Sequence, residues 1–333
     1  MTKINIKISP DVILMDGKEI LIEINTDSVS AGEKHCCEKK TTVFDYIETL
    51  IQRMKDDGRA GTAANYNCAM RSFRKLCGDE QLTFSDFDEA TARHYEAELK
   101  RGGVKMNTIS FYMRTLRAVY NMAVSEGLTD DRHPFRSVYT GIGHTDKRAV
   151  TMDTIRQISR LTTKSKPMAM ARDMFMFSFY TRGMAFVDMA YLTKDNLKDG
   201  VLTYTRKKTG QTLSIKWGKC MQDIVDTYDK TDRSYLLPII RDSMRDSRTQ
   251  YKTRQSDINL QLRRITQLLN LDNNLTMYVA RHSWASIAKD LGIPLNVISE
   301  ALGHNSAKTT QIYLHSIDRN VIDKANAKII KRM

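Results

Sequence analysis

Three side chains near the C-terminal end of the chain could act together on a phosphodiester. The planar guanidinium group of Arg281 can donate two parallel hydrogen bonds to phosphate oxygens. The imidazole of His304 can bind phosphate or transfer a proton, because its charge changes near neutral pH. The hydroxyl group of Tyr313 can attack phosphorus and form a covalent link. Each residue alone is typical of a surface, a helix cap or a core, so the prediction depends on all three occurring together.

Glycine and proline residues predict the elements that position these side chains. Gly292 and Pro294 separate two apolar runs, which predicts two helices. Gly303 ends the second run, and a glycine at the end of a helix commonly adopts a left-handed conformation. His304 is therefore expected at an abrupt turn, with Ser306 capping the next helix.

Three short motifs in this region resemble those of a known family. Residues 281–285 read Arg-His-Ser-Trp-Ala, residues 302–304 read Leu-Gly-His, and residues 309–313 read Thr-Thr-Gln-Ile-Tyr. In this order and at this spacing they resemble the tyrosine recombinase (integrase) family. The resemblance implies a fold that is mainly α with a small β-sheet, in which a helical, SAM-like core-binding domain precedes a mixed α/β catalytic domain. It also implies a site-specific DNA recombinase of the integrase or invertase type, which works through a covalent 3′-phosphotyrosyl intermediate.

The resemblance also implies a role for each catalytic residue. Tyr313 is the nucleophile, and His304 binds phosphate or assists proton transfer. Lys208, at the tip of an expected hairpin, protonates the leaving oxygen. Two arginines neutralise the charge of the phosphate, and we expect these to be Arg281 and Arg182.

Two departures from the family pattern, and one ambiguity within it, concern individual residues. The family has Thr-Gly-x-Arg at its first arginine, whereas a gapless match places Met184 there. Arg182 must therefore reach the phosphate from a shifted position, and Arg172 is the nearest alternative. Tyr278 stands where the family has a histidine; a phenol with a pKa of about 10 is a poor base, but it can donate a hydrogen bond to phosphate. Lys207, next to the expected proton donor, competes for its role.

Composition favours a nucleic-acid partner and a cytoplasmic location. Lysine and arginine outnumber aspartate and glutamate by 52 to 39, a net charge of +13, which attracts polyanions. The five cysteines are odd in number and lack paired spacing, as expected in a reducing cytosol. No apolar run approaches the roughly 20 residues of a membrane span, and the first residues lack the apolar core of a secretory signal. Metal-ligand and nucleotide-loop patterns are also missing, so we expect no cofactor, neither metal nor ATP.

Changes in periodicity divide the 333 residues into four segments. Residues 1–40 contain two isoleucine-rich stretches and a polar linker, which predict a small strand-rich segment without assigned function. Residues 41–130 carry apolar stripes at helical spacing and predict a bundle of about four helices, the core DNA-binding domain in the resemblance. Residues 131–150, punctuated by proline and glycine, predict an interdomain linker. Residues 151–333 form the expected catalytic domain.

Local patterns predict the main elements of the catalytic domain. The apolar run 168–180 is too long for a strand and predicts a buried helix. Residues 201–206 and 211–216 flank Lys-Lys-Thr-Gly and predict a β-hairpin. Residues 251–269 predict a basic helix. After Tyr313, apolar residues at helical spacing predict a tail helix, which packs either on a neighbouring protomer or on its own domain.

Basic residues in the helical segment form two groups, each with the spacing of one helix face. Arg71, Arg74 and Lys75 form one group, and Arg114 and Arg117 form the other. Each group could meet the phosphates or base edges of DNA, or be an ordinary solvated face. The resemblance favours DNA binding, because the family places its core-binding domain on one face of the target.

The resemblance further implies an assembly on DNA. Double-stranded DNA at a specific recombination site is the expected partner, with a homodimer on each site, a homotetramer in the synapse and accessory DNA-bending proteins. The choice among integration, excision and inversion depends on how the DNA sites are arranged. Two other functions use the same residues: a type IB topoisomerase, and a DNA-binding protein with the recombinase fold but no catalytic activity.

Overall fold

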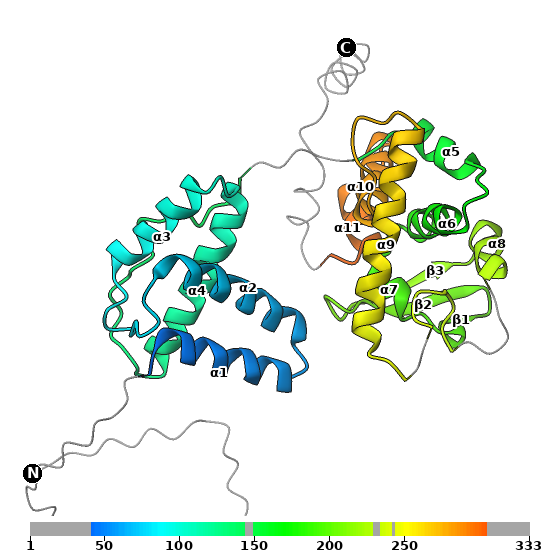
Figure 1. Cartoon of the computed structure of the whole chain (residues 1–333). Coiled ribbons are helices and arrows are strands. Elements are labelled where there is room, and N and C mark those ends of the chain that lie inside the picture. The colour runs from blue at the N-terminus through cyan, green and yellow to red at the C-terminus, as the bar shows by residue number, and fades with distance from the viewer. Residues whose placement is uncertain (1–40, 144–148, 229–233, 242–243, 305–333) are drawn as a thin grey trace, which may run out of the picture. The chain divides into compact units, whose positions relative to one another are not determined.

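The chain folds into two compact units, which divide after Gly143. The computed structural model describes residues 41–143, 149–228, 234–241 and 244–304 (Figure 1). The strands expected in residues 1–40 and the tail expected after Tyr313 lie outside the described residues. Both units are mainly helical, and one small sheet occurs in the described part of unit 2, which confirms the expected fold class.

Unit 1, the part up to Gly143, is the helical bundle that the apolar stripes predict. Its helices are α1 (Val43–Asp56), α2 (Ala60–Cys77), α3 (Glu89–Arg101) and α4 (Met106–Ser125). Helix α1 begins where the side chain of Thr42 accepts a hydrogen bond from the backbone N–H of Asp45 (3.1 Å). Such a cap satisfies an N–H group that has no partner within the helix. Helix α2 packs against α1, α3 and α4.

Aromatic rings around Phe73 form the centre of the unit 1 core. The centroid of the Phe73 ring lies 5.6 Å from that of Phe44, 5.4 Å from that of Phe87 and 5.0 Å from that of Tyr95. These tilted and edge-on pairs are the geometries that the ring quadrupole favours. They join α1, α2, α3 and the segment before α3 into one core.

The segment after α4 belongs to unit 1 as far as Gly143, so residues 131–143 of the linker expected at residues 131–150 are part of the bundle. Phe135 and Val138 are buried in the unit 1 core, with 4% and 7% of their surface exposed. The hydroxyl of Ser110 donates to the carbonyl oxygen of Gly141 (2.6 Å), which ties the segment to α4. Proline and glycine here make turns against the bundle, because two apolar side chains anchor the segment.

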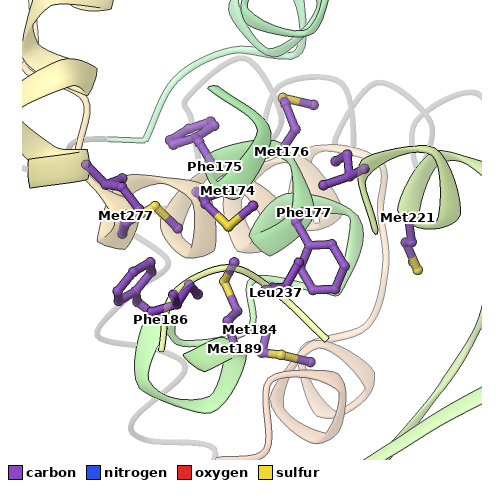
Figure 2. Close-up of a cluster of buried hydrophobic side chains, with 14 of the residues drawn as sticks. Met174, Phe175, Met176, Phe177, Met184, Phe186, Met189, Met221, Leu237 and Met277 are labelled. Carbon is purple, nitrogen blue, oxygen red and sulfur yellow. The ribbon is translucent and has the colours of Figure 1, made fainter. Parts of the chain in front are cut away.

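Unit 2 is organised around α6, the buried helix predicted from the apolar run. Its helices are α5 (Met152–Arg160), α6 (Lys166–Tyr180), α7 (Phe186–Ala190), α8 (Lys219–Tyr228), α9 (Ser247–Leu268), α10 (Met277–Asp290) and α11 (Leu295–Ala301). Helix α6 contacts α5, α8, α9 and α10, the cover that a helix without a polar face requires. Figure 2 shows Met174 and Phe177 of α6 packed with Met184 and Met189, and flexible methionine side chains fill irregular gaps in such a core.

A small antiparallel sheet in unit 2 contains the predicted hairpin. Its strands, in spatial order, are β1 (Leu197–Lys198), β2 (Val201–Thr205) and β3 (Thr212–Lys216). Leu202 pairs with Ile215 and Tyr204 pairs with Leu213, and these residues face the core while their neighbours are exposed. Strand β1 has two residues and is too short for an alternation to reveal it. No helix in the described ranges combines the length and apolar character needed to cross a bilayer.

Candidate active site

Helix α10 places Arg281 inside unit 2, with 4% of its surface exposed. Its guanidinium group donates to the carbonyl oxygens of Gly183 (2.8 Å) and Leu302 (2.5 Å). Its Nη2 atom also lies 3.0 Å from Nε2 of His304. A buried charge needs such partners, because burying it alone is strongly unfavourable. The structure therefore brings together two of the residues expected from the sequence and holds the arginine in one orientation.

The predicted turn at the end of α11 presents His304 to this arginine. Gly303 has φ 63°, the left-handed conformation expected of a helix-ending glycine. The backbone N–H of His304 donates to the carbonyl oxygen of Ser299 (3.0 Å), which closes the turn. A Cβ atom on Gly303 would lie 2.6 Å from Cδ of Arg206. The glycine thus makes the turn and leaves space for a second arginine.

That second arginine, Arg206, was not among the expected site residues. It follows β2 on the buried face, in step with Leu202 and Tyr204, and is 6% exposed. Its Nη1 atom donates to the carbonyl oxygen of Gly303, and its Nε atom lies 3.8 Å from Oδ2 of Asp188. The signal was present in the sequence, because the alternation of β2 extends to residue 206 and makes it an arginine on the core side.

Asp188 supplies the negative charge at the centre of the site. It is the acidic residue of the short helix α7, and 4% of its surface is exposed. Its Oδ1 atom accepts a hydrogen bond from the backbone N–H of Lys207 (2.9 Å). Burial raises the pKa of this carboxyl, while the hydrogen bond and the charges of Arg206 and Arg281 oppose the rise. The sequence offered one sign of this buried residue, because Asp188 is the only carboxylate in the otherwise apolar α7.

Arg182 lies in the turn between α6 and α7, beside the closest approach of α10. It has φ 59°, and Gly183 follows with φ 71°. A Cβ atom on Gly183 would lie 2.7 Å from Cα of Arg281, so a glycine is required for α10 to pack here. Met184, which a gapless match aligns with the family's arginine, is buried in the core with 1% of its surface exposed. Its side chain therefore has no path to a phosphate.

Arg182 lies close enough to the buried Tyr204 for its charge to act on the hydroxyl group. Burial, with the nearby Asp188, raises the pKa of Tyr204 to about 12. The positive charges of Arg281, Arg206 and Arg182 act against this rise, so all three lie near the hydroxyl. The turn at residue 182 thus adds a third guanidinium group to the two buried ones.

His304 is neutral at physiological pH. Burial, followed by the charges of Arg281, Arg206 and Lys208, lowers the pKa of His304 to about 4. A guanidinium group can only donate, so the Nε2 atom of His304 that faces Arg281 is an acceptor. The expectation that this imidazole changes charge near neutral pH is corrected, because its neighbours are cations.

The two lysines at the hairpin tip have different surroundings. The Nζ atom of Lys207 lies 4.0 Å from the ring centroid of Tyr191, a cation–π contact. Lys208 is exposed, and its charge is one of those that lower the pKa of His304. The charge of Lys207 acts on Asp188 in the same cluster, so the choice of Lys208 as the proton donor stays a prediction.

The two remaining tyrosines of the expected site have different positions. Tyr278 precedes Arg281 by one helical turn, is 56% exposed, and packs edge-on against the ring of His282 with centroids 4.4 Å apart. It lies at the surface, whereas Arg281 is buried. Tyr313 lies outside the described residues.

The cluster as a whole is suited to an anion. Two guanidinium groups, those of Arg206 and Arg281, act on the buried carboxylate of Asp188, while the charge of Arg182 acts on Tyr204 and that of Lys208 acts on His304. Fixed guanidinium groups donate paired hydrogen bonds to the oxygens of a phosphate. Within the described residues, no three His, Cys, Asp or Glu side chains gather into a group that could hold a metal ion.

In unit 1, the residues expected to bind DNA differ in how free their charges are. Arg71, Lys75 and Arg117 are exposed. Arg74 forms an ion pair with Glu48 (2.8 Å) and lies over the ring of Phe44. Arg114 is exposed, and its Nε atom donates to a carbonyl oxygen of its own helix (3.3 Å). Arg117 also lines a surface hollow of about 700 Å³.

Family comparison agrees with this architecture. The phage integrase family matches residues 148–320, and the phage integrase SAM-like domain matches residues 42–138. The chain belongs to the phage integrase family, and it is therefore a tyrosine recombinase, an enzyme of the class that breaks and rejoins DNA.

Individual relatives extend over most of the chain. Tyrosine recombinase XerC of Alcanivorax borkumensis is 25% identical over 81% of this chain and 88% of its own length. XerA of Thermococcus kodakarensis is 23% identical over 74% of this chain and 85% of its own length. The Tn1549 transposon integrase in complex with a circular intermediate DNA has a TM-score of 0.66 at 15% identity, over 88% of this chain and 99% of that one. A lambda integrase tetramer bound to a Holliday junction has a TM-score of 0.63 at 15% identity, over 85% and 81%. These structural likenesses show a shared fold.

Proposed function

We propose that the chain is a site-specific recombinase of the integrase type, which cleaves and rejoins double-stranded DNA through a 3′-phosphotyrosyl intermediate at Tyr313. The main support is the buried arginine pair: Arg281 and Arg206 both donate to the end of α11, and the chain leads from there to Tyr313. Guanidinium groups that are fixed before the substrate arrives stabilise the developing charge of the phosphate without reorganisation.

The proposed reaction assigns a proton to each oxygen that needs one. The phenolic oxygen of Tyr313 attacks phosphorus, and the bond from phosphorus to the 5′ oxygen breaks. Lys208 gives its proton to that oxygen, which leaves as a hydroxyl group. The attacking phenol gives its proton to water, and the neutral imidazole of His304, whose Nε2 atom accepts from Arg281, donates its Nδ1–H to a phosphate oxygen. Because the phosphotyrosine preserves the energy of the ester bond, attack by the 5′ hydroxyl of another strand rejoins the DNA without ATP.

We assign the two phosphate-binding guanidinium groups to Arg281 and Arg206. Arg206 is 6% exposed and lies beside Asp188, whereas Arg182, the residue expected from the sequence, is partly exposed. Arg206→Lys should slow cleavage by about 10²–10³-fold, the usual cost of one oxyanion donor, and Arg182→Lys by less. If Arg182→Lys slows cleavage more than Arg206→Lys, the second phosphate-binding arginine is Arg182.

We further propose a homodimer on each DNA site and a homotetramer in the synapse. Lambda integrase, which shares this fold, is seen as a dimer on a core site and as a tetramer on a Holliday junction. Exchange of two duplexes requires four strand cleavages, so four sites are needed. Sedimentation of the protein with its selected DNA should give two protomers per site.

Covalent capture from a pool of random nicked duplexes tests the chemistry and selects the cleaved DNA sequence in the same step. A nick near the cleavage position releases a short fragment, so the adduct cannot reverse. We expect adducts that resist denaturation, with the DNA-linked peptide containing Tyr313. Tyr313→Phe should abolish them, and Tyr180→Phe, which removes a hydroxyl elsewhere in unit 2, should not. An adduct that survives in Tyr313→Phe would show that another residue is the nucleophile.

The alternative function is a DNA-binding protein without catalysis. It is motivated by Met184, which is buried at the position of the family's first arginine. It predicts strong, salt-dependent DNA binding with no covalent species from any duplex in the pool. The cluster that includes Arg206 argues against it, because a non-catalytic protein has no need of a second buried guanidinium group.

A further inference from the structure

Three consecutive residues at the hairpin tip have three different surroundings. Arg206 is buried and donates to the carbonyl oxygen of Gly303. The ammonium group of Lys207 lies over the ring of Tyr191, 4.0 Å from its centroid. Lys208 is exposed and close enough to His304 for its charge to act on the imidazole. The tip is therefore held by the two residues that precede Lys208.

Helix α7 and the residue after it provide both attachment points for Lys207. Asp188 accepts the backbone N–H of Lys207 (2.9 Å), and Tyr191, the C-cap residue of α7, lies under its ammonium group. These anchors lie three residues apart, on one side of the helical turn. One residue is thus fixed at its backbone and at the end of its side chain.

The ring of Tyr191 is itself held by α9 and the segment before it. Its hydroxyl group lies 3.0 Å from Oγ of Ser247. Its ring packs edge-on against those of Tyr251 and Tyr235, with centroids 6.0 Å and 6.3 Å away. Because the Tyr191 ring is fixed by these contacts, the ammonium group of Lys207 has a defined position over it.

We propose that Tyr191 and Lys207 are positioning residues, which fix the hairpin tip so that Lys208 reaches the leaving 5′ oxygen. This inference rests on the proposed function. A lysine side chain has four flexible carbons, and proton transfer requires its nitrogen within hydrogen-bond distance of the acceptor. Holding the preceding residue at both ends restricts where Lys208 can point, and such restriction lowers the barrier of the step that uses it. The ammonium group of Lys207 itself lies over the ring of Tyr191.

A substrate with sulfur in place of the bridging 5′ oxygen separates this role from simple stabilisation of the hairpin. A thiol has a pKa of about 8.5, so its thiolate leaves without a proton when the phosphorus–sulfur bond breaks. Loss of the proton donor should therefore slow cleavage of the oxygen substrate and not that of the sulfur substrate. General damage to unit 2 should slow both equally.

The test uses two matched pairs of variants in the full chain, with nicked oxygen and sulfur duplexes of the captured sequence. Tyr191→Leu and Lys207→Met remove the contact, while Tyr191→Phe and Lys207→Arg keep a ring and a cation. We expect the first pair to cleave the oxygen substrate roughly tenfold more slowly, a change of about 1.4 kcal/mol. On the sulfur substrate, Tyr191→Leu and Lys207→Met should cleave within about twofold of the wild-type rate. Tyr191→Phe and Lys207→Arg should cleave both substrates within about twofold of the wild-type rate. Lys208→Met shows the effect of losing the proton donor itself. Its cleavage of the oxygen substrate should fall further than that of the other variants, and its cleavage of the sulfur substrate should be close to wild type.

Three outcomes would overturn the inference. Equal slowing of both substrates in Tyr191→Leu and Lys207→Met would show that the contact only stabilises the fold. A loss in Lys207→Met as large as that in Lys208→Met, with the same recovery on sulfur, would make Lys207 a proton donor. A wild-type protein that forms no adduct with either substrate would overturn the proposed function, and this inference with it; the first two outcomes leave the proposed function intact.

Discussion

The two units treat charge in opposite ways. In the described part of unit 1, the one buried charged residue is Glu96, 8% exposed and paired with Lys100. In the described part of unit 2, two arginines and two aspartates are buried: Asp173, Asp188, Arg206 and Arg281. Burying a charge costs free energy that good partners only offset. Three of these four residues, Asp188, Arg206 and Arg281, lie in the cluster where we propose that a phosphate binds, whereas Asp173 pairs with Arg172 and Tyr228 elsewhere in unit 2.

This difference in where the charges lie suggests that unit 2 carries out the reaction and that unit 1 binds DNA. Ion pairs in unit 1 lie at the surface, such as Arg53 with Glu126 and Arg74 with Glu48, and such pairs contribute about 0–1 kcal/mol. The arginines of unit 2 have fixed backbone acceptors and cannot be replaced by another cation without loss. Variants in unit 2 should therefore change the rate of cleavage, and variants in unit 1 should change binding or stability.

Arg281→Lys should give the largest effect. A lysine cannot donate to the carbonyl oxygens of Gly183 and Leu302 and still direct a planar pair of donors at a phosphate. We expect cleavage of a nicked duplex to fall by about 10³-fold, with DNA affinity within a few-fold of wild type. Arg117→Lys in unit 1, assayed at saturating DNA, is the matched control and should cleave at the wild-type rate. Similar losses in the two variants would remove the distinction between the units.

Gly183→Ala should destabilise unit 2 strongly, whereas Gly78→Ala should affect unit 1 mildly. Both glycines have positive φ, 71° and 72°, but a Cβ atom on Gly183 would meet Arg281 and one on Gly78 would meet nothing within 4 Å. We expect losses of about 1–2 kcal/mol at Gly78, from the left-handed conformation alone, and about 3 kcal/mol or more at Gly183. Both tryptophans, Trp217 and Trp284, lie in unit 2, so their fluorescence in urea reports that unit, and circular dichroism reports both. Equal losses of unfolding free energy in the two variants would contradict the close packing of Gly183 against Arg281.

His304 should make unit 2 less stable as the pH falls from about 6.5 to 4. Its folded pKa of about 4 lies below the usual value of 6.5, so the unfolded chain binds more protons in this range. The free energy of unfolding should therefore rise with pH across it, and the profile of His304→Gln should lack that contribution. Urea unfolding from pH 4 to 7 for both proteins gives the difference. A difference that is constant with pH would mean that the imidazole is not held neutral.

The smallest effects should come from unit 1. Arg117→Gln should lower the slope of log affinity against log salt by about one, because one phosphate contact is lost. Arg74→Gln should leave that slope unchanged and lower stability by about 0.5–1 kcal/mol, because its side chain is bonded to Glu48 and lies over Phe44. Filter binding at several salt concentrations distinguishes the two. Equal slopes for both variants would show that neither or both contact DNA.

The sequence predicted most helices and the hairpin. It predicted those site residues that belong to a recognisable motif. The helices of unit 1, the buried α6 and the hairpin followed from apolar spacing, and Arg281 and His304 followed from their motifs. Arg206 was missed because a charged residue on the core side of a strand looks like the end of that strand. Phe135 was assigned to a linker because its neighbours suggested turns, and only the core shows what it packs against. The low pKa of His304 depends first on burial and then on cations from two segments far apart in the sequence, α10 and the hairpin tip.

The end of α11 has a consequence for how the enzyme could be controlled. Arg281 and Arg206 each hold one of two successive peptide carbonyls, those of Leu302 and Gly303. Tyr313, the proposed nucleophile, is nine residues beyond His304 in the sequence. A pull on the chain beyond His304 would therefore act first on the two peptide groups that Arg281 and Arg206 bind, and so on the two arginines that we propose to bind the phosphate.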